Sequence, residues 1–256
     1  MPDTIVYEQP LNERIRAFLR LEKLFRQFSW HCKHGSEWNN PIAIDALIEL
    51  MAITTRSDVK LEVHKELERQ HSRLQSLAQR PQIDQKQLDS ILSNLKQRIT
   101  EMQQSAGQMG KELQSVELLN AVRQKNSLPG CICDFDLPAL RFWLTREAAL
   151  QQKHLEKWYA AFSHLDRAVQ LILDVIRHSV EATDETAGNG FYQQSLDTSA
   201  SMQLLRIRLD RQLACYPEIS AGKHRFSVRF MANSNPDQRA EQCKQDVPFQ
   251  LQICAI

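Results

Sequence analysis

The sequence predicts an α+β protein. A mainly helical N-terminal domain carries a projecting antiparallel helix pair, and a smaller antiparallel β-sheet domain is built mostly from the C-terminal quarter. Apolar residues recur every three or four positions up to about Ser179, the period of helices with one buried face. Beyond Thr183 they alternate with polar residues, the period of half-buried strands. The 256 residues are enough for two compact units. We expect a helical domain over 11–180 and a β-domain over 184–256, which the N-terminal segment 3–9 can join.

The first predicted helix begins after Asn12, a residue type that favours the N-cap position. Its apolar face follows helical spacing and ends near Trp30. The opposite face carries Arg16, Arg20 and Lys23, which are three or four residues apart, so these cations are expected to form a stripe along one side of the helix.

Two longer helices are predicted over residues 59–77 and 84–102. Pro81 interrupts the pattern between them, and Asp84 with Gln87 offers a capping-box start for the second helix. Both helices are polar outside a narrow apolar seam. This composition is more typical of a projecting antiparallel pair than of a globular core.

The helical part continues with helices predicted over residues 113–122, 140–144, 155–162 and 165–176. Between the first two, the segment from Cys131 to Phe135 is short and bounded by turn signals, so a strand is predicted there. Asp136 is expected to cap the following helix, with Pro138 in the first turn, where a missing N–H is harmless.

Four arginines occupy the polar positions of two predicted strands. Arg206 and Arg208 alternate with apolar residues of one strand, and Arg225 and Arg229 with those of another. If the strands are neighbours, the guanidinium groups share one face, and such a surface attracts carboxylates through bidentate hydrogen bonds. Alternatively, the arginines only solvate the outer side of a half-buried sheet. Acidic residues are scarce in this part of the chain, so both interpretations stay open with equal weight.

Composition limits the classes of protein. The formal net charge is +1 with 25% charged residues, so an acidic partner has to be attracted by a local basic patch. The N-terminus has no apolar run of the signal-peptide kind, and no stretch approaches the ~20 apolar residues of a membrane span. The six scattered cysteines do not form a secreted disulfide scaffold. We expect a cytoplasmic protein with reduced thiols and no membrane insertion.

Motifs for catalysis or metal binding are missing from the sequence. It contains no glycine-rich phosphate loop, nucleophile elbow or HExxH, and only 7 glycines in all. His31-Cys32-x-His34 has no second cluster at zinc-finger spacing, and Cys131-x-Cys133 places two thiols on opposite faces of a strand. We therefore expect no enzyme activity, no metal and no cofactor.

Several longer motifs together resemble the ZapD family. One lies in the middle of the chain and a longer one near its end: Phe135-Asp136-Leu137-Pro138-x-Leu140-x-x-Trp143-Leu144, and Tyr216-Pro217-x-Ile219-Ser220-x-x-Lys223-x-Arg225-Phe226-x-Val228-Arg229-Phe230-Met231. Near the start, Pro10-Leu11-Asn12-Glu13 and Leu19-Arg20-Leu21-Glu22 match as well. The resemblance runs from about Val6 to Met231.

The resemblance implies a bacterial cell division factor in the cytoplasm, recruited to mid-cell at the Z-ring. It implies a homodimer that binds the C-terminal tail of the tubulin-like protein FtsZ through basic residues, and that cross-links and bundles FtsZ filaments. By position, the family's tail-binding residues fall on Arg16, Arg20, Arg225 and Arg229, and also on Arg56 and Arg141, whereas Glu117 stands where a basic residue is expected. The basic strands add Arg206, Arg208 and Lys223 to the candidate partner-binding residues.

Two other functions stay open from the residues alone. One is a helical adaptor that binds another protein through the polar hairpin, residues 59–102. The other is nucleic-acid binding by the basic sheet, but base recognition on a sheet needs aromatic side chains on the same face as the cations. Phe226 and Phe230 have the opposite parity to Arg225 and Arg229, so we expect no nucleic-acid partner.

Overall fold

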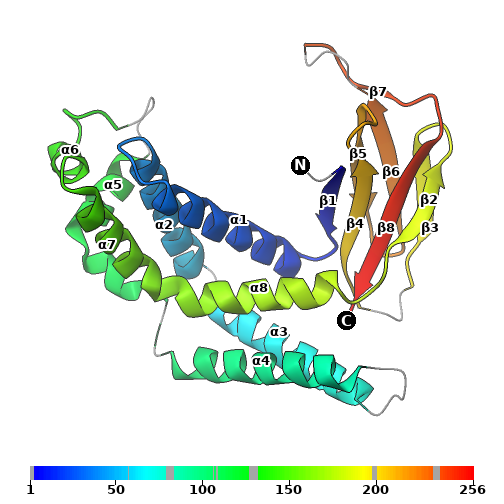
Figure 1. Ribbon diagram of the computed structural model, residues 1–256, viewed down its shortest axis with the longest axis horizontal. Coiled ribbons are helices and arrows are strands. Elements are labelled where there is room, and N and C mark those ends of the chain that lie inside the picture. Colours follow the sequence, from blue (N-terminus) through cyan, green and yellow to red (C-terminus); the bar gives the residue numbers. More distant parts are fainter. Residues whose placement is uncertain are drawn as a thin grey trace. The chain divides into compact units, whose positions relative to one another are not determined.

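The computed structural model describes residues 3–56, 58–78, 84–105, 107, 109–126, 132–197, 201–232 and 237–256. The chain divides into two compact units, one formed by Phe18–Ile172 and the other by Met1–Ala17 with Leu173–Ile256 (Figure 1). We call them the helical unit and the β-unit. The α+β class predicted from the sequence is confirmed, because helices fill the first unit and antiparallel strands the second.

The helical unit contains most of two helices whose ends belong to the β-unit, α1 (Glu13–Lys33) and α8 (Ser163–Arg177). The elements between them are α2 (Asn39–Arg56), α3 (Val59–Leu77), α4 (Gln85–Gln104), the 3-10 turn η1 (Lys111–Ser115), α5 (Glu117–Lys125), α6 (Pro138–Leu144), α7 (Ala148–Tyr159) and the 3-10 turn η2 (Ala160–Phe162).

The predicted start of α1 is confirmed, because the backbone N–H of Ile15 donates to Oδ1 of Asn12 at 2.9 Å. Farther along α1, Phe28 stacks on Tyr159 with ring centroids 4.2 Å apart. In the same unit the buried Gln151 of α7 donates to the carbonyl oxygen of Leu144 at 3.1 Å and accepts from the amide of Asn40 in α2. A buried polar side chain bonded on both sides in this way fixes how α2, α6 and α7 pack.

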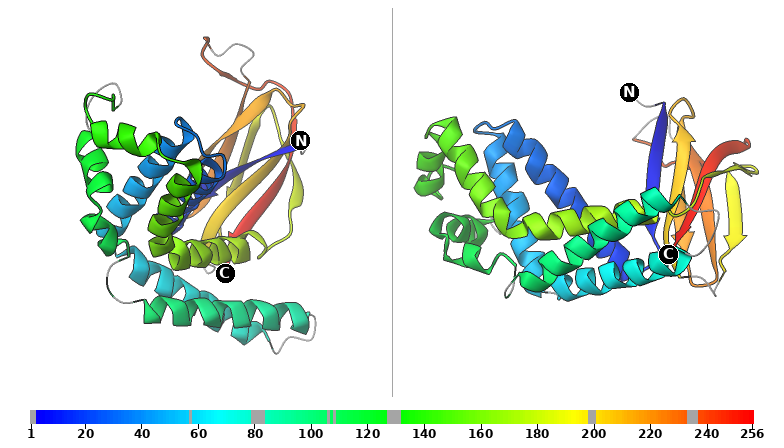
Figure 2. Two further views of the ribbon diagram at one scale, coloured as in Figure 1. Left: turned by 60° about the vertical axis from the view of Figure 1, so that its left-hand side comes forward. Right: turned by 60° about the horizontal axis from the view of Figure 1, so that its bottom comes forward.

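The predicted helix pair is confirmed by α3 and α4, which lie side by side and antiparallel (Figure 2). Asp84 caps α4 by accepting from the backbone N–H groups of Lys86 and Gln87 at 2.9 and 3.2 Å. The buried seam is narrow, as the sequence indicated, and consists of Val63, Leu67, Leu88, Leu95 and Met102.

The strand predicted from Cys131 to Phe135 is wrong for the part that the structure describes, 132–135. Asp136 forms a turn instead: its backbone N–H donates to the carbonyl oxygen of Cys133 at 2.9 Å, and its carboxylate accepts from the Cys133 N–H at 3.0 Å. This carboxylate therefore does not cap α6, whose N-cap is Leu137 without a side-chain hydrogen bond. Pro138 occupies the first turn of α6, as predicted. Cys131 lies outside the described residues.

The β-unit is a sandwich of two antiparallel sheets. One sheet has the order β1-β4-β8-β2, and the other has the order β3-β6-β5 with β7 also paired to β6 (Figure 1). The strands are β1 (Thr4–Pro10), β2 (Thr183–Ala187), β3 (Phe191–Ser195), β4 (Met202–Asp210), β5 (Cys215–Ala221), β6 (Arg225–Ala232), β7 (Glu241–Gln242) and β8 (Val247–Ala255). The period-two pattern beyond residue 183 thus gives strands, as predicted.

One apolar core lies between the two sheets. The alternate apolar residues of β4, β6 and β8 all take part in it, and Phe230 of β6 lies 5.1 Å, centroid to centroid, from Phe249 of β8. Since successive strand residues point to opposite faces, the polar residues between them are forced onto the outer face of each sheet.

The backbone of Phe230 shows which way the end strand β5 faces. Its N–H donates to the carbonyl oxygen of Gly190, and its carbonyl oxygen accepts from the N–H of Cys243, both at 2.8 Å, so both groups point away from β5. Pro217 of β5 stands opposite Phe230. The proline nitrogen is therefore directed to the open edge of the sheet.

We expect Phe230→Ala to lower the free energy of unfolding of the β-unit by about 3–5 kcal/mol, because it removes a fully buried ring from this core. Urea denaturation followed by circular dichroism measures this loss. Phe191→Ala is the matched control, since its ring is 40% exposed on the outer face of the same sheet, and a change of under about 1 kcal/mol is expected. Equal losses for the two variants would contradict the two-sheet core.

Candidate partner-binding surfaces

Arg225 and Arg229 lie on the outer face of the β3-β6-β5 sheet. Phe226, Val228 and Phe230 of the same strand are fully buried between the sheets, so the two arginines point outward and are exposed. Within the described residues neither arginine has an ion pair. Two unpaired guanidinium groups are therefore available to a partner.

The spacing of these arginines limits what they can bind together. They are four residues apart on one strand, so their Cα atoms are about 13 Å apart at the usual rise of ~3.3 Å per residue. An extended peptide or a helix lying along β6 can contact both. The neighbouring strands place Phe191 and Glu218 on either side of Arg229. Lys223 is exposed in the turn that leads into Arg225.

Arg206 and Arg208 do not share this face. They belong to β4, which lies in the other sheet, and they point to the outer side of that sheet. A single face with four arginines would require β4 and β6 to be neighbouring strands. They lie in different sheets, so no such face forms. The alternation of polar and apolar residues predicts which face of the sheet a residue lies on, but it does not predict which strands pair with each other.

Arg206 belongs to a mostly buried ion cluster around Glu8. Strand register places Glu8 of β1 opposite Arg206 of β4. The Glu8 carboxylate accepts from Arg206 Nε at 2.8 Å and from Arg177 Nε and Nη2 at 2.8 and 2.7 Å. Arg206 also donates to Gln252 Oε1 at 2.9 Å, and Gln252 in turn donates to the carbonyl oxygen of Val180 at 2.8 Å. We call this group the Glu8 cluster.

The Glu8 cluster holds its carboxylate in the charged form. Burial by itself raises the pKa of Glu8, but the hydrogen bonds and charges of Arg177 and Arg206 outweigh it and leave the pKa below the ordinary value. The contacts of Arg206 with Glu8 and Gln252 link β4 to β1 and β8. Its predicted role in binding a partner stays a prediction. Arg208 donates to Gln252 Oε1 at 3.2 Å and is half-buried.

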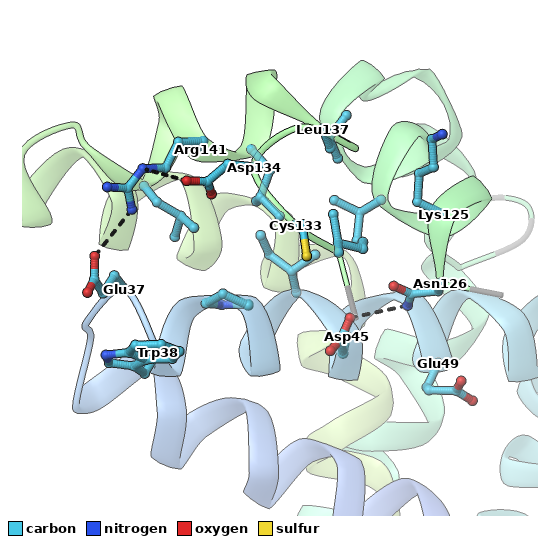
Figure 3. Close-up of a pocket in the computed structure, with 16 residues that line it drawn as sticks. Glu37, Trp38, Asp45, Glu49, Lys125, Asn126, Cys133, Asp134, Leu137 and Arg141 are labelled. Carbon is cyan, nitrogen blue, oxygen red and sulfur yellow. Dashed lines mark hydrogen bonds and ion pairs between the residues drawn. The ribbon is translucent and has the colours of Figure 1, made fainter. Parts of the chain in front are cut away.

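The remaining predicted residues lie on helices. Arg16 and Arg20 are one turn apart on α1, with Arg20 exposed and Arg16 Nε 3.2 Å from the Glu13 carboxylate. Arg141 of α6 is exposed and lies between two carboxylates, 3.4 Å from Glu37 and 3.5 Å from Asp134 (Figure 3). Arg56 is the last residue of α2, and its side chain lies outside what the structure describes.

The residues of the His31-Cys32-x-His34 motif have other partners. Nδ1 of His31 is 2.8 Å from Oδ1 of Asn39, and Nδ1 of His34 is 2.7 Å from the carbonyl oxygen of Trp30. Burial raises the pKa of Cys32, and the charge of Glu156 adds to this effect. Across the described part of the chain, no three His, Cys, Asp or Glu side chains are grouped so that they could hold a metal ion.

Comparison with known proteins identifies the relationship. The model of the ZapD family, described as a cell division protein, matches residues 19–229. The chain belongs to this family. The cell division protein ZapD of Methylococcus capsulatus is 38% identical over 256 residues, which is 100% of both chains. Those of Nitrosomonas europaea and Cupriavidus pinatubonensis are 32% and 36% identical over 98% of this chain and over 95% and 99% of their own. Among the described helices of this ZapD-family chain, none is long and apolar enough to cross a membrane.

Sequence reasoning missed the Glu8 cluster of this ZapD-family protein. The role of Glu8 depends on partners 169 and 198 residues away in the sequence. The sequence indicates this cluster only weakly. It shows one carboxylate in a short N-terminal strand and two arginines in a distant strand, but not that the two strands pair.

We expect Glu8→Gln to lower the free energy of unfolding of the β-unit by roughly 3 kcal/mol at neutral pH, because it leaves two mostly buried guanidinium groups without their carboxylate. The folded pKa of Glu8 is lowered, so its contribution is complete at neutral pH and is lost as the pH falls through that pKa. The difference between variant and wild type should therefore shrink in acid.

Urea denaturation at several pH values measures this dependence. Glu241→Gln is the matched control, since Glu241 is exposed on β7. A difference between Glu8→Gln and wild type that stays constant down to strongly acidic pH would contradict the assigned role of the carboxylate.

Proposed function

We propose that this ZapD-family chain is a non-enzymatic cross-linker in cell division, which binds the C-terminal tail of FtsZ and bundles FtsZ filaments as a dimer. Family membership supports the division role. The observation that carries the binding site is the pair of exposed, outward-pointing arginines on β6, Arg225 and Arg229. Lys223 adds a third cation beside them, and Arg16 and Arg20 are further members of the proposed tail-binding set.

The proposed site suits an acidic partner segment. Guanidinium groups bind carboxylates bidentately, and within the described residues neither Arg225 nor Arg229 forms an ion pair, although Glu218 stands opposite Arg229 on β5. The spacing of about 13 Å between the two Cα atoms suits a segment with acidic groups that runs along the strand. Exposed ion pairs are weak, about 0.2–1 kcal/mol each. The many tails along a filament compensate for the weakness of each contact, because a bound molecule has other tails close by and therefore rebinds at a high effective concentration.

We expect the double variant Arg225→Glu and Arg229→Glu to weaken binding of a fluorescein-labelled FtsZ tail peptide on the order of tenfold, because it replaces two attractive contacts by repulsive ones. Co-sedimentation with FtsZ filaments should then fall more steeply than peptide binding, since bundling depends on two sites. Wild-type binding should itself weaken as salt is added.

Lys86→Glu with Lys96→Glu is the matched control. It makes the same change in net charge on exposed positions of α4, and it also tests the alternative that the polar hairpin is the recognition surface. Undiminished bundling by the folded β6 variant would refute the proposed site. Loss of bundling by the hairpin variant alone would favour the adaptor, and loss of a gel shift with DNA in the β6 variant would favour nucleic-acid binding.

The proposed dimer is tested separately by sedimentation velocity of the purified chain. We expect a dimer at the concentrations that bundle filaments, and the β6 variant should keep the same oligomeric state as wild type. A monomer that still bundles FtsZ would contradict a cross-linker whose two sites come from two copies of the chain.

A further inference from the structure

A cavity of about 740 Å³ lies within the helical unit, between α2, α5 and α6 (Figure 3). Its apolar lining comes from all three helices and includes Ile44, Val122 and Leu140. This volume is in the range that binds a drug-sized molecule or several side chains of a peptide. The proposed tail-binding arginines of β6 are not part of it, whereas Arg141, a tail-binding position implied by the family resemblance, lines it.

One wall of the cavity carries two carboxylates that form no ion pair with any described residue. Asp45 and Glu49 are one turn apart on α2, and like charges at this spacing destabilise a helix. Asp45 is half-buried and accepts one hydrogen bond from the Asn126 amide at 3.2 Å. Burial raises the pKa of Asp45, and the charge of Glu49 adds to the increase, so a cation placed here would relieve both effects.

The cations around the cavity leave this wall acidic. Arg141 is held between Glu37 and Asp134, as described above, so its charge is already matched. Lys125 lines the cavity but forms no ion pair with any residue that the structure describes (Figure 3). The balance of carboxylates over free cations favours a positively charged ligand and disfavours an acidic one.

A large aromatic side chain also belongs to the cavity. Trp38 lines it and is 79% exposed. An exposed aromatic group beside an apolar cavity is typical of surfaces that bind other proteins, and a tryptophan face also attracts cations.

We propose that this cavity binds a short amphipathic segment of a partner protein, which inserts its apolar side chains between α2 and α6 and directs a lysine or arginine to Asp45 and Glu49. The apolar lining supplies the area that a helix-in-groove contact buries. The two carboxylates select the charge of the segment. This partner chemistry is opposite to that of the acidic segment proposed for β6, so the inference stands apart from the proposed function.

Fluorescence anisotropy with two probes tests the proposal. The first probe is a fluorescein-labelled amphipathic peptide with leucines on one face and lysines on the other, and the second has every lysine replaced by glutamate. We expect the lysine probe to bind the full-length wild-type chain and the glutamate probe not to bind. Asp45→Asn with Glu49→Gln, which keeps side-chain size and removes both charges, should weaken the lysine probe about tenfold.

Two controls make the result decisive. Glu112→Gln with Glu117→Gln removes the same charge from exposed positions of η1 and α5 outside the cavity lining, and it should leave binding unchanged. Trp38→Ala should weaken the lysine probe while circular dichroism shows an unchanged helix content. No binding of the lysine probe, equal binding to the Asp45/Glu49 variant, or equal binding of both probes would overturn the proposal. Displacement of the lysine probe by an FtsZ tail peptide would also overturn it, because the cavity would then belong to the tail site.

Discussion

The β-unit depends on one constraint, which is that two sheets share a single apolar core. Every second residue of β4, β6 and β8 has to point into that core, so the residues between them have no choice of direction. The two outer faces then differ in what covers them. On the β1-β4-β8-β2 sheet, the Glu8 carboxylate pairs with the outward Arg206 and also with Arg177, whereas on the β3-β6-β5 sheet Arg225 and Arg229 remain exposed.

Local patterns predicted local structure well. The cap at Asn12, the cap at Asp84 and the seam of the α3-α4 pair each depend on residues a few positions apart, so the sequence carries all the information that they need. The alternation in β4 and β6 likewise predicted which residues face inward. The incorrect strand prediction over 132–135 also has a local cause, since Asp136 bonds to the backbone of Cys133 and competes with extended structure.

Long-range arrangement could not be predicted in the same way. Whether β4 lies beside β6 is decided by how β1 and β8 pair with β4, and those strands come from the two ends of the chain. The same holds for the cavity, where Asp45 and Asn126 meet although 81 residues separate them. The spacing of apolar residues predicts the buried face of each helix, but it does not predict which charged residues of different helices line the same cavity.

The two surfaces that we propose differ in the sign of their charge. The β6 face offers cations to an acidic segment, and the α2 wall offers carboxylates to a basic one. On a chain with a formal net charge of +1, neither attraction arises from the molecule as a whole. Each partner would be selected by a local field that reaches about one Debye length, so both interactions should weaken as salt is added.

The orientation of Pro217 has a consequence for the proposed cross-linker, of which many copies would bind along the same filaments. An unpaired strand edge can add a strand from a neighbouring molecule, and growth of that kind is hard to reverse. At β5 the approaching strand would meet a proline nitrogen where it needs an N–H donor. This edge is therefore a poor template for sheet extension, so crowded copies of the proposed cross-linker would meet through side chains and not through a continuous sheet.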